Sequence, residues 1–335
     1  MRVGVIGAGS WGTAVAGLAA ASTETVLWAR RADLAETITK THENPDYLPG
    51  HQLPRKLSAT SNLDEVATAD VVIVGVPSHG YRAVLERCAA SIGASTPVIS
   101  LSKGIEQGTL MRMTEVTGDV LPSHDPGLIG VLTGPNLARE IAAGQPAATV
   151  IAMPDLANAE PLQRLLMSSS LRVYTNRDVV GCESAGALKN VMAIAAGMAR
   201  GLEFGHNTMA TLITRALAEL TRLGVAMGGE PLTFSGLAGM GDLIATCMSS
   251  QSRNNQVGVG LGQGRKLEDI IRDMNMVAEG VKSTRGVLEL ADRYDIEMPI
   301  ATQVGRVLYE GASPTEVLKV LMGRDAKREL HGIRD

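Results

Sequence analysis

The chain has 335 residues, of which 45% are hydrophobic and 20% charged, and its formal net charge is −4. This length and composition predict a folded protein of about two domains with sizeable cores. Aromatic residues make up only 3% of the chain, so base-stacking surfaces are not expected, and the charge gives no general attraction to nucleic acid or anionic membranes.

The first predicted element is a strand–turn–helix unit at the start of the chain. An apolar run at residues 3–6 indicates a buried strand, and residues 13–21 indicate a helix of small residues. Gly7, Gly9 and Gly12 lie between them, in a pattern that lets backbone approach a pyrophosphate at a helix N-terminus. The unit therefore predicts a dinucleotide site, with a glycine turn used only for packing as the alternative.

The end of the second predicted strand bears on the choice of cofactor. An acidic residue that binds the adenosine ribose is usual there, about 20 residues beyond the glycines. This chain has Arg30 and Arg31 instead. Since an arginine suits the 2′-phosphate of NADP, we expect NADPH to be accepted. An ordinary solvated basic turn is an equal alternative, and the choice between NADH and NADPH stays open.

Further short apolar runs predict six more strands, with helical stretches between several of them. They are residues 25–28, 71–76, 97–101, 128–132, 148–152 and 171–174. This alternation is typical of a mostly parallel sheet covered on both faces, in which ligands bind at the carboxyl ends of the strands. Candidate ligand-binding residues follow three of those ends, among them Lys103, Gly134 and Asn136.

The second half of the chain differs, because the β-branched runs stop near Asp178 and helical periodicity follows. We therefore predict an α/β Rossmann-type N-terminal domain with a mostly parallel sheet at residues 1–180. An all-α C-terminal domain is predicted at residues 181–335.

Lys189 is the strongest catalytic candidate in the helical half. It lies in CESAGALKNVMAIAAGMARG, where helical spacing surrounds it with apolar or small residues. Burial lowers the pKa of a lysine and so favours proton transfer. A lysine that reaches solvent from a helix end, or a structural ion pair, is the alternative.

A second polar cluster lies in GLAGMGDLIATCMSSQSRNNQVG. Its glycines predict a close-packed bend that presents Asp242, and Ser252, Arg253 and Asn254 follow as compact donors. A phosphate dianion suits a guanidinium fork, a hydroxyl and an amide. A polar helix-capping loop explains the same residues, so by itself the cluster does not predict a phosphate site.

Cysteine and histidine usage gives no indication of a metal or a disulfide framework. Cys88, Cys182 and Cys247 are odd in number and far apart, which fits a reducing compartment. The most apolar later segment, residues 185–202, is interrupted by two basic residues and is too short between them to span a bilayer. We expect a cytoplasmic protein without membrane insertion.

Taken together, the segments resemble the bacterial-type NAD(P)-dependent glycerol-3-phosphate dehydrogenases. The similarity runs in order through GAGSWGTA, LWAR, VPSH, SLSKGIE, TGPNLAREIAAG, GALKNVMAIAAGM, LITRALAE, GLAGMGDL, QSRN, VAEG and EMPI. The resemblance implies a Rossmann-type domain that binds the dinucleotide, followed by a helical domain that binds substrate and carries catalysis, usually in a homodimer. It also implies reversible reduction of dihydroxyacetone phosphate by NADH or NADPH to sn-glycerol 3-phosphate, for phospholipid synthesis.

The resemblance assigns roles to individual residues. The general acid/base would be Lys189. Substrate contacts would come from Lys103, Gly134, Asn136, Lys189, Asp242, Ser252, Arg253 and Asn254. Cofactor contacts would come from Ser10, Trp11, Arg30, Lys103, Ala138, Arg253, Val277 and Glu279, beside Gly7, Gly9, Gly12 and Arg31. The sequence departs from the family at Asn136, where many relatives carry Thr or Ser.

Two other functions remain in competition with this one. A hydroxyacid dehydrogenase or ketopantoate-type reductase would use the same layout on a carboxylate substrate, which needs no phosphate pocket. A nucleotide-sensing module would keep the cofactor fold without turnover, against which the presence of Lys189, Lys103 and Asp242 argues.

Overall fold

The computed structural model describes residues 1–274, 278–326, 328 and 329, and the chain forms two compact units. Unit 1 consists of Met1–Lys103 and Met111–Val179, and unit 2 consists of Gly104–Leu110 and Val180–Asp335. The chain crosses from unit 1 to unit 2 between Val179 and Val180, next to the boundary that we predict between residues 180 and 181. The short segment Gly104–Leu110 also belongs to unit 2, which the sequence did not indicate.

Unit 1 is built on an eight-stranded sheet in the order β3-β2-β1-β4-β5-β6-β7-β8. Its strands are β1 (Arg2–Ile6), β2 (Glu24–Trp28), β3 (Leu57–Thr60), β4 (Val71–Val74), β5 (Val98–Ser100), β6 (Ile129–Thr133), β7 (Ala147–Ala152) and β8 (Leu171–Asn176). The first six strands have the 3-2-1-4-5-6 order of doubly wound dinucleotide-binding sheets, which confirms the predicted Rossmann-type fold.

The sheet is mostly parallel, as predicted, and its one antiparallel pairing among the described residues is β6 with β7. Every strand expected from an apolar run is present. The sequence analysis missed β3, which pairs with β2 at the edge of the sheet. Its sequence, LSAT, has only one buried residue, Leu57, so it lacks the apolar run by which the other strands were recognised.

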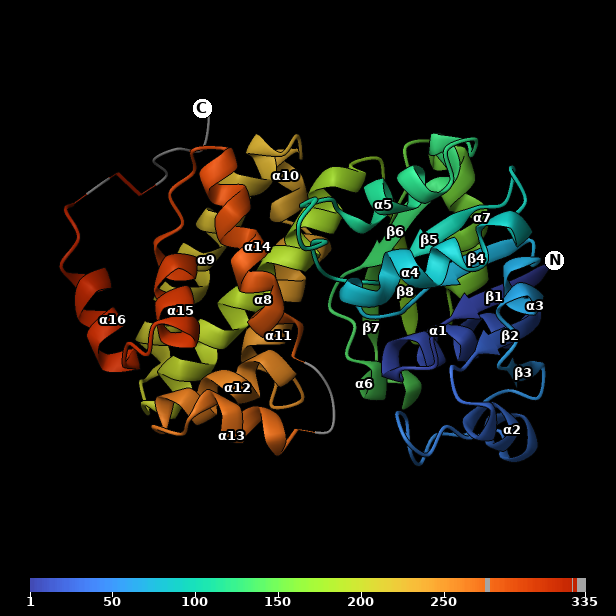
Figure 1. Ribbon diagram of the computed structural model, residues 1–335, viewed down its shortest axis with the longest axis horizontal. Coiled ribbons are helices and arrows are strands. Elements are labelled where there is room, and N and C mark those ends of the chain that lie inside the picture. The colour runs from blue at the N-terminus through green and yellow to red at the C-terminus, as the bar shows by residue number, and fades with distance from the viewer. Residues whose placement is uncertain (275–277, 327, 330–335) are drawn as a thin grey trace. The chain divides into compact units, whose positions relative to one another are not determined.

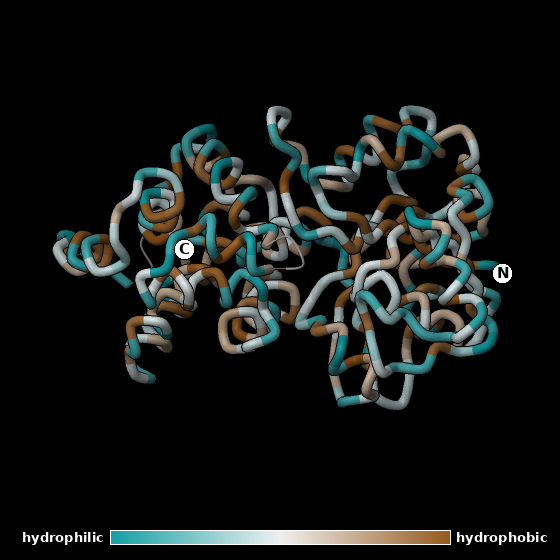
Figure 2. The backbone as a smooth tube through the Cα atoms, turned by 60° about the horizontal axis from the view of Figure 1, so that its bottom comes forward, coloured by the Kyte–Doolittle hydropathy of each residue, from teal (hydrophilic) through white to brown (hydrophobic). Residues whose placement is uncertain are grey.

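Helices cover both faces of this sheet (Figure 1). They are α1 (Ser10–Ala20), α2 (Ala32–Thr41), α3 (Leu63–Ala67), α4 (Tyr81–Glu86), α5 (Met113–Val120), α6 (Ala138–Ala142) and α7 (Leu156–Leu166). Side chains alternate along each strand, so Val71 and Ile73 pack in one core with α1, α2 and α7, while Val72 and Val74 pack in the other with α3, α4 and α5. In Figure 2, segments of hydrophobic residues run through the interior, and hydrophilic residues lie at many outer turns.

From Val180 onward, the regular structure of the described part of unit 2 is helical, which confirms the predicted all-α domain. Its helices are α8 (Val179–Gly201), α9 (His206–Ala226), α10 (Pro231–Phe234), α11 (Asp242–Met248), α12 (Arg253–Gly262), α13 (Leu267–Arg272), α14 (Glu279–Arg293), α15 (Pro299–Tyr309) and α16 (Pro314–Met322), with a π-helical turn, η4 (Leu237–Gly241), before α11. The longest, α8, lies among α11, α12 and α14 (Figure 1).

Helix α8 has 23 residues, so by length and composition it could cross a membrane, contrary to our expectation that this segment is too short. However, 89% of its most apolar stretch is buried inside the protein. Every residue from Gly181 to Ala199 is buried. A helix that is mostly apolar and buried on all sides by the rest of the protein is a core helix.

Glu219 on α9 is a buried carboxyl group at the start of α15. It accepts hydrogen bonds from the backbone N–H groups of Ile300 (2.8 Å) and Ala301 (3.3 Å). Burial raises the pKa of Glu219 to about 7, because the loss of hydration outweighs these two N–H donors and the positive charges of Arg222 and Arg324. The group therefore links the stability of the helical unit to pH.

We expect the free energy of unfolding to fall as pH rises through the range from about 4.5 to 7, since over that range the folded state holds the Glu219 proton and the unfolded state has lost it. The contribution amounts to about 3 kcal/mol, at about 1.4 kcal/mol per pKa unit. Denaturant unfolding at several pH values measures it. Glu219→Gln should remove this slope, and an unchanged slope in the variant would assign it to other groups.

Candidate active site

The predicted glycine turn connects β1 to α1 in unit 1. Gly7 has a φ of +122°, a left-handed conformation that favours glycine. A Cβ at Gly12 would lie 2.0 Å from the carbonyl oxygen of Gly7, so α1 begins directly against the turn. At Gly9 no atom lies within 4 Å of the Cβ position. This open backbone at a helix N-terminus fits the pyrophosphate of a dinucleotide.

Two side chains beside the turn bear on the same fit. Trp11, in the first turn of α1, has a buried indole N–H without a hydrogen-bond partner among the described residues. Buried donors are normally satisfied, so this one suits an acceptor on a bound ligand. Ser10 Oγ instead donates to the carbonyl of Tyr47 at 2.6 Å. The sequence analysis missed Asn44, whose side-chain amide braces the turn by donating to the Ala8 carbonyl (2.9 Å).

The two arginines at the end of β2 differ in their surroundings. Arg31 is paired with Asp46, and its Nε lies 3.5 Å from Asp33 Oδ1. Arg30 is exposed and has no hydrogen bond or ion pair within the described parts of the chain. Arg30 is therefore the one of the two whose guanidinium is not already engaged by carboxylates.

The loops after β5 and β6 lie at neighbouring strand ends. Lys103 Nζ donates to the carbonyl of Gly134 at 3.0 Å, which ties the two loops together. Gly134 has a φ of +131°, another conformation that favours glycine. Both amide atoms of the Asn136 side chain are buried without a hydrogen-bond partner in the described structure. Ala138 is the first residue of α6.

In unit 2, Lys189 is part of a buried polar group with two residues of α11. Its Nζ donates to Thr246 Oγ1 at 2.6 Å and lies 3.1 Å from Asp242 Oδ1. Thr246 Oγ1 in turn donates to Asp242 Oδ1 at 3.2 Å. Lys189 is 5% exposed and Asp242 only 2%. The ammonium does not reach solvent at a helix end. It is held in a defined direction by a carboxylate and a hydroxyl.

The glycines before α11 explain how Asp242 reaches this position. A Cβ at Gly239 would lie 2.1 Å from the carbonyl oxygen of Phe234, so the π-helical turn η4 packs tightly on α10. Asp242 follows η4 as the first residue of α11. Thr246, four residues later, lies on the same face of that helix. The sequence analysis missed Thr246, although its i,i+4 spacing from Asp242 was a usable signal.

Ser252, Arg253 and Asn254 begin α12, and part of this cluster caps and braces helices. Ser252 Oγ accepts the N–H of Asn255 at 3.3 Å, which is an N-cap. The Asn254 amide donates to Asn190 Oδ1 (3.0 Å) and accepts the N–H of Gly280 (2.9 Å). The helix-capping interpretation therefore holds for Ser252, and Asn254 links α12 to α8 and α14.

Arg253 differs from its two neighbours, because its side chain is exposed at the first position of α12. Partial burial nevertheless removes water from its guanidinium and so lowers the pKa of Arg253, while the carboxylate of Glu279 acts to raise it. Glu279 is the first residue of α14. Val277, which we predict to contact the cofactor, lies outside the described residues.

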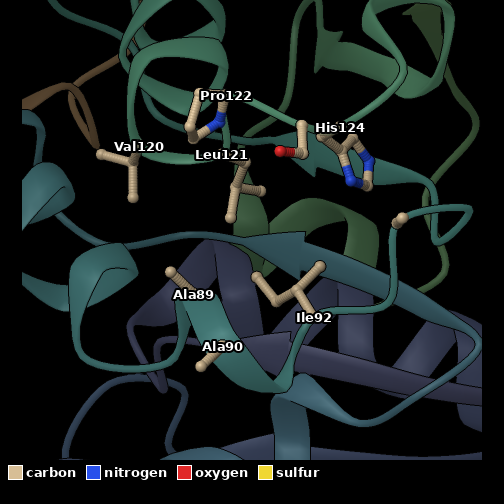
Figure 3. Close-up of a pocket in the computed structure, with 9 residues that line it drawn as sticks. Ala89, Ala90, Ile92, Val120, Leu121, Pro122 and His124 are labelled. Atoms are coloured by element: carbon tan, nitrogen blue, oxygen red, sulfur yellow. The ribbon is translucent and has the colours of Figure 1, made fainter.

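The predicted site residues thus form one set in each unit. Unit 1 contains the glycine turn, the two arginines and the loops with Lys103 and Asn136. Unit 2 contains Lys189, Asp242 and the start of α12. A cavity of about 220 Å³ also lies in unit 1, with Leu121 on one side and Ala89 and Ile92 on the other (Figure 3), and no predicted site residue lines it.

Comparison with known proteins decides what kind of protein carries these two sets. Family models of the NAD-dependent glycerol-3-phosphate dehydrogenase N-terminus and C-terminus match residues 2–159 and 178–319. The chain belongs to this dehydrogenase family. Both sets of predicted site residues lie within the matched segments.

Individual members of the dehydrogenase family are similar over nearly the whole chain. Glycerol-3-phosphate dehydrogenase [NAD(P)+] 2 of Sphingopyxis alaskensis is 54% identical over 99% of both chains. Glycerol-3-phosphate dehydrogenase [NAD(P)+] of Streptomyces coelicolor is 50% identical over 98% of both. The crystal structure of glycerol-3-phosphate dehydrogenase from Coxiella burnetii has a TM-score of 0.91 and 35% identity, covering 96% of this chain and 99% of that one.

Proposed function

We propose that the protein catalyses the reversible, NAD(P)H-dependent reduction of dihydroxyacetone phosphate to sn-glycerol 3-phosphate, a precursor of glycerophospholipids. The observation that carries this proposal is the buried Lys189 ammonium, held by Asp242 and Thr246 in a chain of this dehydrogenase family. Relatives that are 54% and 50% identical over nearly the full length are named glycerol-3-phosphate dehydrogenase [NAD(P)+]. A ketopantoate-type reductase is therefore not favoured.

In this mechanism Lys189 is the general acid. When bound, the reduced nicotinamide supplies a hydride to the carbonyl carbon of the substrate. The carbonyl oxygen gains negative charge, and Lys189 Nζ donates a proton to it, forming the hydroxyl group. Asp242 and Thr246 hold Lys189 Nζ in a fixed direction. The charge of Asp242 favours the ammonium form before the reaction, and the fixed direction orients the proton that is donated. The neutral lysine then regains a proton from solvent.

Arg253 is the residue that we assign to the substrate phosphate. A guanidinium presents parallel N–H donors that match two phosphate oxygens. The N-terminal end of the α12 dipole adds to the same positive potential. Ser252 and Asn254 support this site chiefly as cap and brace, given the hydrogen bonds they already make. The substrate roles of Lys103, Gly134 and Asn136 stay predictions.

Unit 1 would hold the dinucleotide and unit 2 the substrate, which is the division of roles that we predict for residues 1–180 and 181–335. We also infer a cytoplasmic homodimer, from the family resemblance. Sedimentation of the purified protein tests the dimer, and a monomer mass at micromolar concentration would contradict it.

The test of the proposed function is oxidation of NADPH, and separately of NADH, by the purified protein on addition of dihydroxyacetone phosphate. We expect turnover, with glycerol 3-phosphate of the sn configuration as the product. Loss of cofactor absorbance without that product, or no loss with either NADPH or NADH, would contradict the proposal.

The choice between the two cofactors gives a separate prediction. Arg30→Ala should raise the KM for NADPH by about tenfold or more, since one charge-assisted hydrogen bond contributes about 1.5–3 kcal/mol. The KM for NADH, which lacks the 2′-phosphate, should change little. Steady-state kinetics with both cofactors measures the ratio. Arg31→Ala is the matched control, because Arg31 is already paired with Asp46. An equal effect of Arg30→Ala on both cofactors would contradict the assignment.

A further inference from the structure

Arg200, near the end of α8, lies at the centre of a hydrogen-bonded network that the mechanism above does not use. It follows Lys189 by about three helical turns, so the two side chains leave the same face of α8. Its Nη2 donates to the carbonyl of Met248 at 2.8 Å and approaches that of Cys247 at 3.4 Å. Its Nη1 donates to Asn255 Oδ1 at 3.2 Å.

Asn255 closes this network into a ring. Its Nδ2 donates to the same Cys247 carbonyl at 2.9 Å, and the residue is only 1% exposed. Met248 and Cys247 are the last residues of α11, whose terminal carbonyls have no partner within the helix. Arg200 and Asn255 thus satisfy the end of α11 and bind it to the first turn of α12.

The short connection between those two helices carries the proposed phosphate donors. It runs from Ser249 to Ser252 and leads directly into Arg253. The Ser252 N–H donates to the Ser249 carbonyl at 3.2 Å, which makes the connection a tight turn. With Met248 held at one end and Asn255 at the other, both ends of the turn are tied to Arg200.

Close packing of α12 on α8 fixes the network further. A Cβ at Gly197 would lie 2.1 Å from the carbonyl oxygen of Asn255, and one at Gly258 would lie 2.1 Å from that of Ile194. The two helix backbones are therefore in direct contact beside Arg200. A change in the α11–α12 turn cannot be absorbed by movement of α12 away from α8 without breaking this contact.

We propose that Arg200, together with Asn255, is a positioning residue for phosphate recognition: it holds the α11–α12 turn so that Arg253 is ordered before substrate binds. The inference rests on the proposed function. Ordering a donor in advance removes an entropic cost from binding, and the benefit is confined to ligands that use that donor. Lys189, whose partners precede Met248 on α11, keeps its own contacts.

The test compares substrates with and without a phosphate group. Arg200→Met should raise the KM for dihydroxyacetone phosphate by about tenfold, the size expected when one or two side chains must be ordered on binding. The kcat should stay within about twofold, and kcat/KM for unphosphorylated dihydroxyacetone should not change. Arg200→Lys, which keeps a donor near Met248 but loses the fork, should give an intermediate KM.

Two controls separate positioning from general destabilisation. Arg222→Met removes an arginine that likewise donates to a backbone carbonyl, that of Glu297 at 3.1 Å on another part of unit 2, and it should leave the KM unchanged. In the Arg253→Ala background, Arg200→Met should add almost nothing, because the donor it orders is gone.

An unchanged KM in Arg200→Met, an equal loss with dihydroxyacetone, or full additivity with Arg253→Ala would each overturn the inference. These results leave the proposed function intact if the wild-type protein reduces dihydroxyacetone phosphate. A wild-type protein that does not reduce it contradicts both.

Discussion

Lys189→Met is expected to lower kcat for dihydroxyacetone phosphate reduction by about 10²–10⁴-fold, the usual contribution of a positioned general acid. Methionine keeps an unbranched apolar side chain in α8 but has no proton to donate. The cofactor should bind nearly as in the wild type, because Lys189 belongs to unit 2 and the glycine turn to unit 1. Steady-state turnover and calorimetric titration with NADPH measure the two quantities separately.

The control for Lys189→Met addresses the carboxylate that it leaves behind. Asp242 would remain 2% exposed without its ammonium partner, which costs about 3–5 kcal/mol when one partner of a buried pair is removed. The double variant Lys189→Met/Asp242→Asn removes both charges and should recover stability but not activity. Wild-type kcat in either variant would exclude Lys189 as the proton donor.

Arg253→Ala is expected to raise the KM for dihydroxyacetone phosphate by about 10–150-fold, since each hydrogen bond to a charged group contributes about 1.5–3 kcal/mol. The kcat/KM for unphosphorylated dihydroxyacetone should fall little, because that substrate has no group for the guanidinium to bind. The ratio of the two kcat/KM values is the quantity to compare between wild type and variant.

A matched control for Arg253→Ala is Arg265→Ala, which removes an exposed arginine paired with Asp273 in the same unit. It should leave both substrates unaffected, since exposed ion pairs contribute little. If Arg253→Ala lowered kcat/KM equally for both substrates, the residue would serve the fold or the cofactor, and the phosphate assignment would be wrong.

The fold could be predicted from the sequence wherever burial leaves a local pattern. Val71 to Val74 is buried on both faces of the sheet and is therefore a continuous apolar run. Strand β3 escaped prediction because an exposed edge strand needs no such run. The antiparallel direction of β7 follows from how the chain returns after β6, and no residue in β7 indicates it.

The residues of the candidate site also differ in whether the sequence alone reveals them. Lys189 was recognisable because a lysine inside an apolar helix conflicts with its surroundings, and Asp242 because glycines precede it. Thr246 and Asn44 were missed because threonine and asparagine are ordinary surface residues. Their importance comes from partners distant in sequence: Lys189 and Thr246 are 57 positions apart, and only the packing of the folded chain brings such partners together.

The most direct test of the central claim is a side-by-side assay of NADPH oxidation by the wild-type protein with dihydroxyacetone phosphate and with ketopantoate. The buried Lys189 group and the Arg253 guanidinium predict a kcat/KM for dihydroxyacetone phosphate that is higher by about two orders of magnitude or more, corresponding to about 2.7 kcal/mol. Equal values would contradict the account, and a preference for ketopantoate would identify the protein as a reductase of carboxylate substrates.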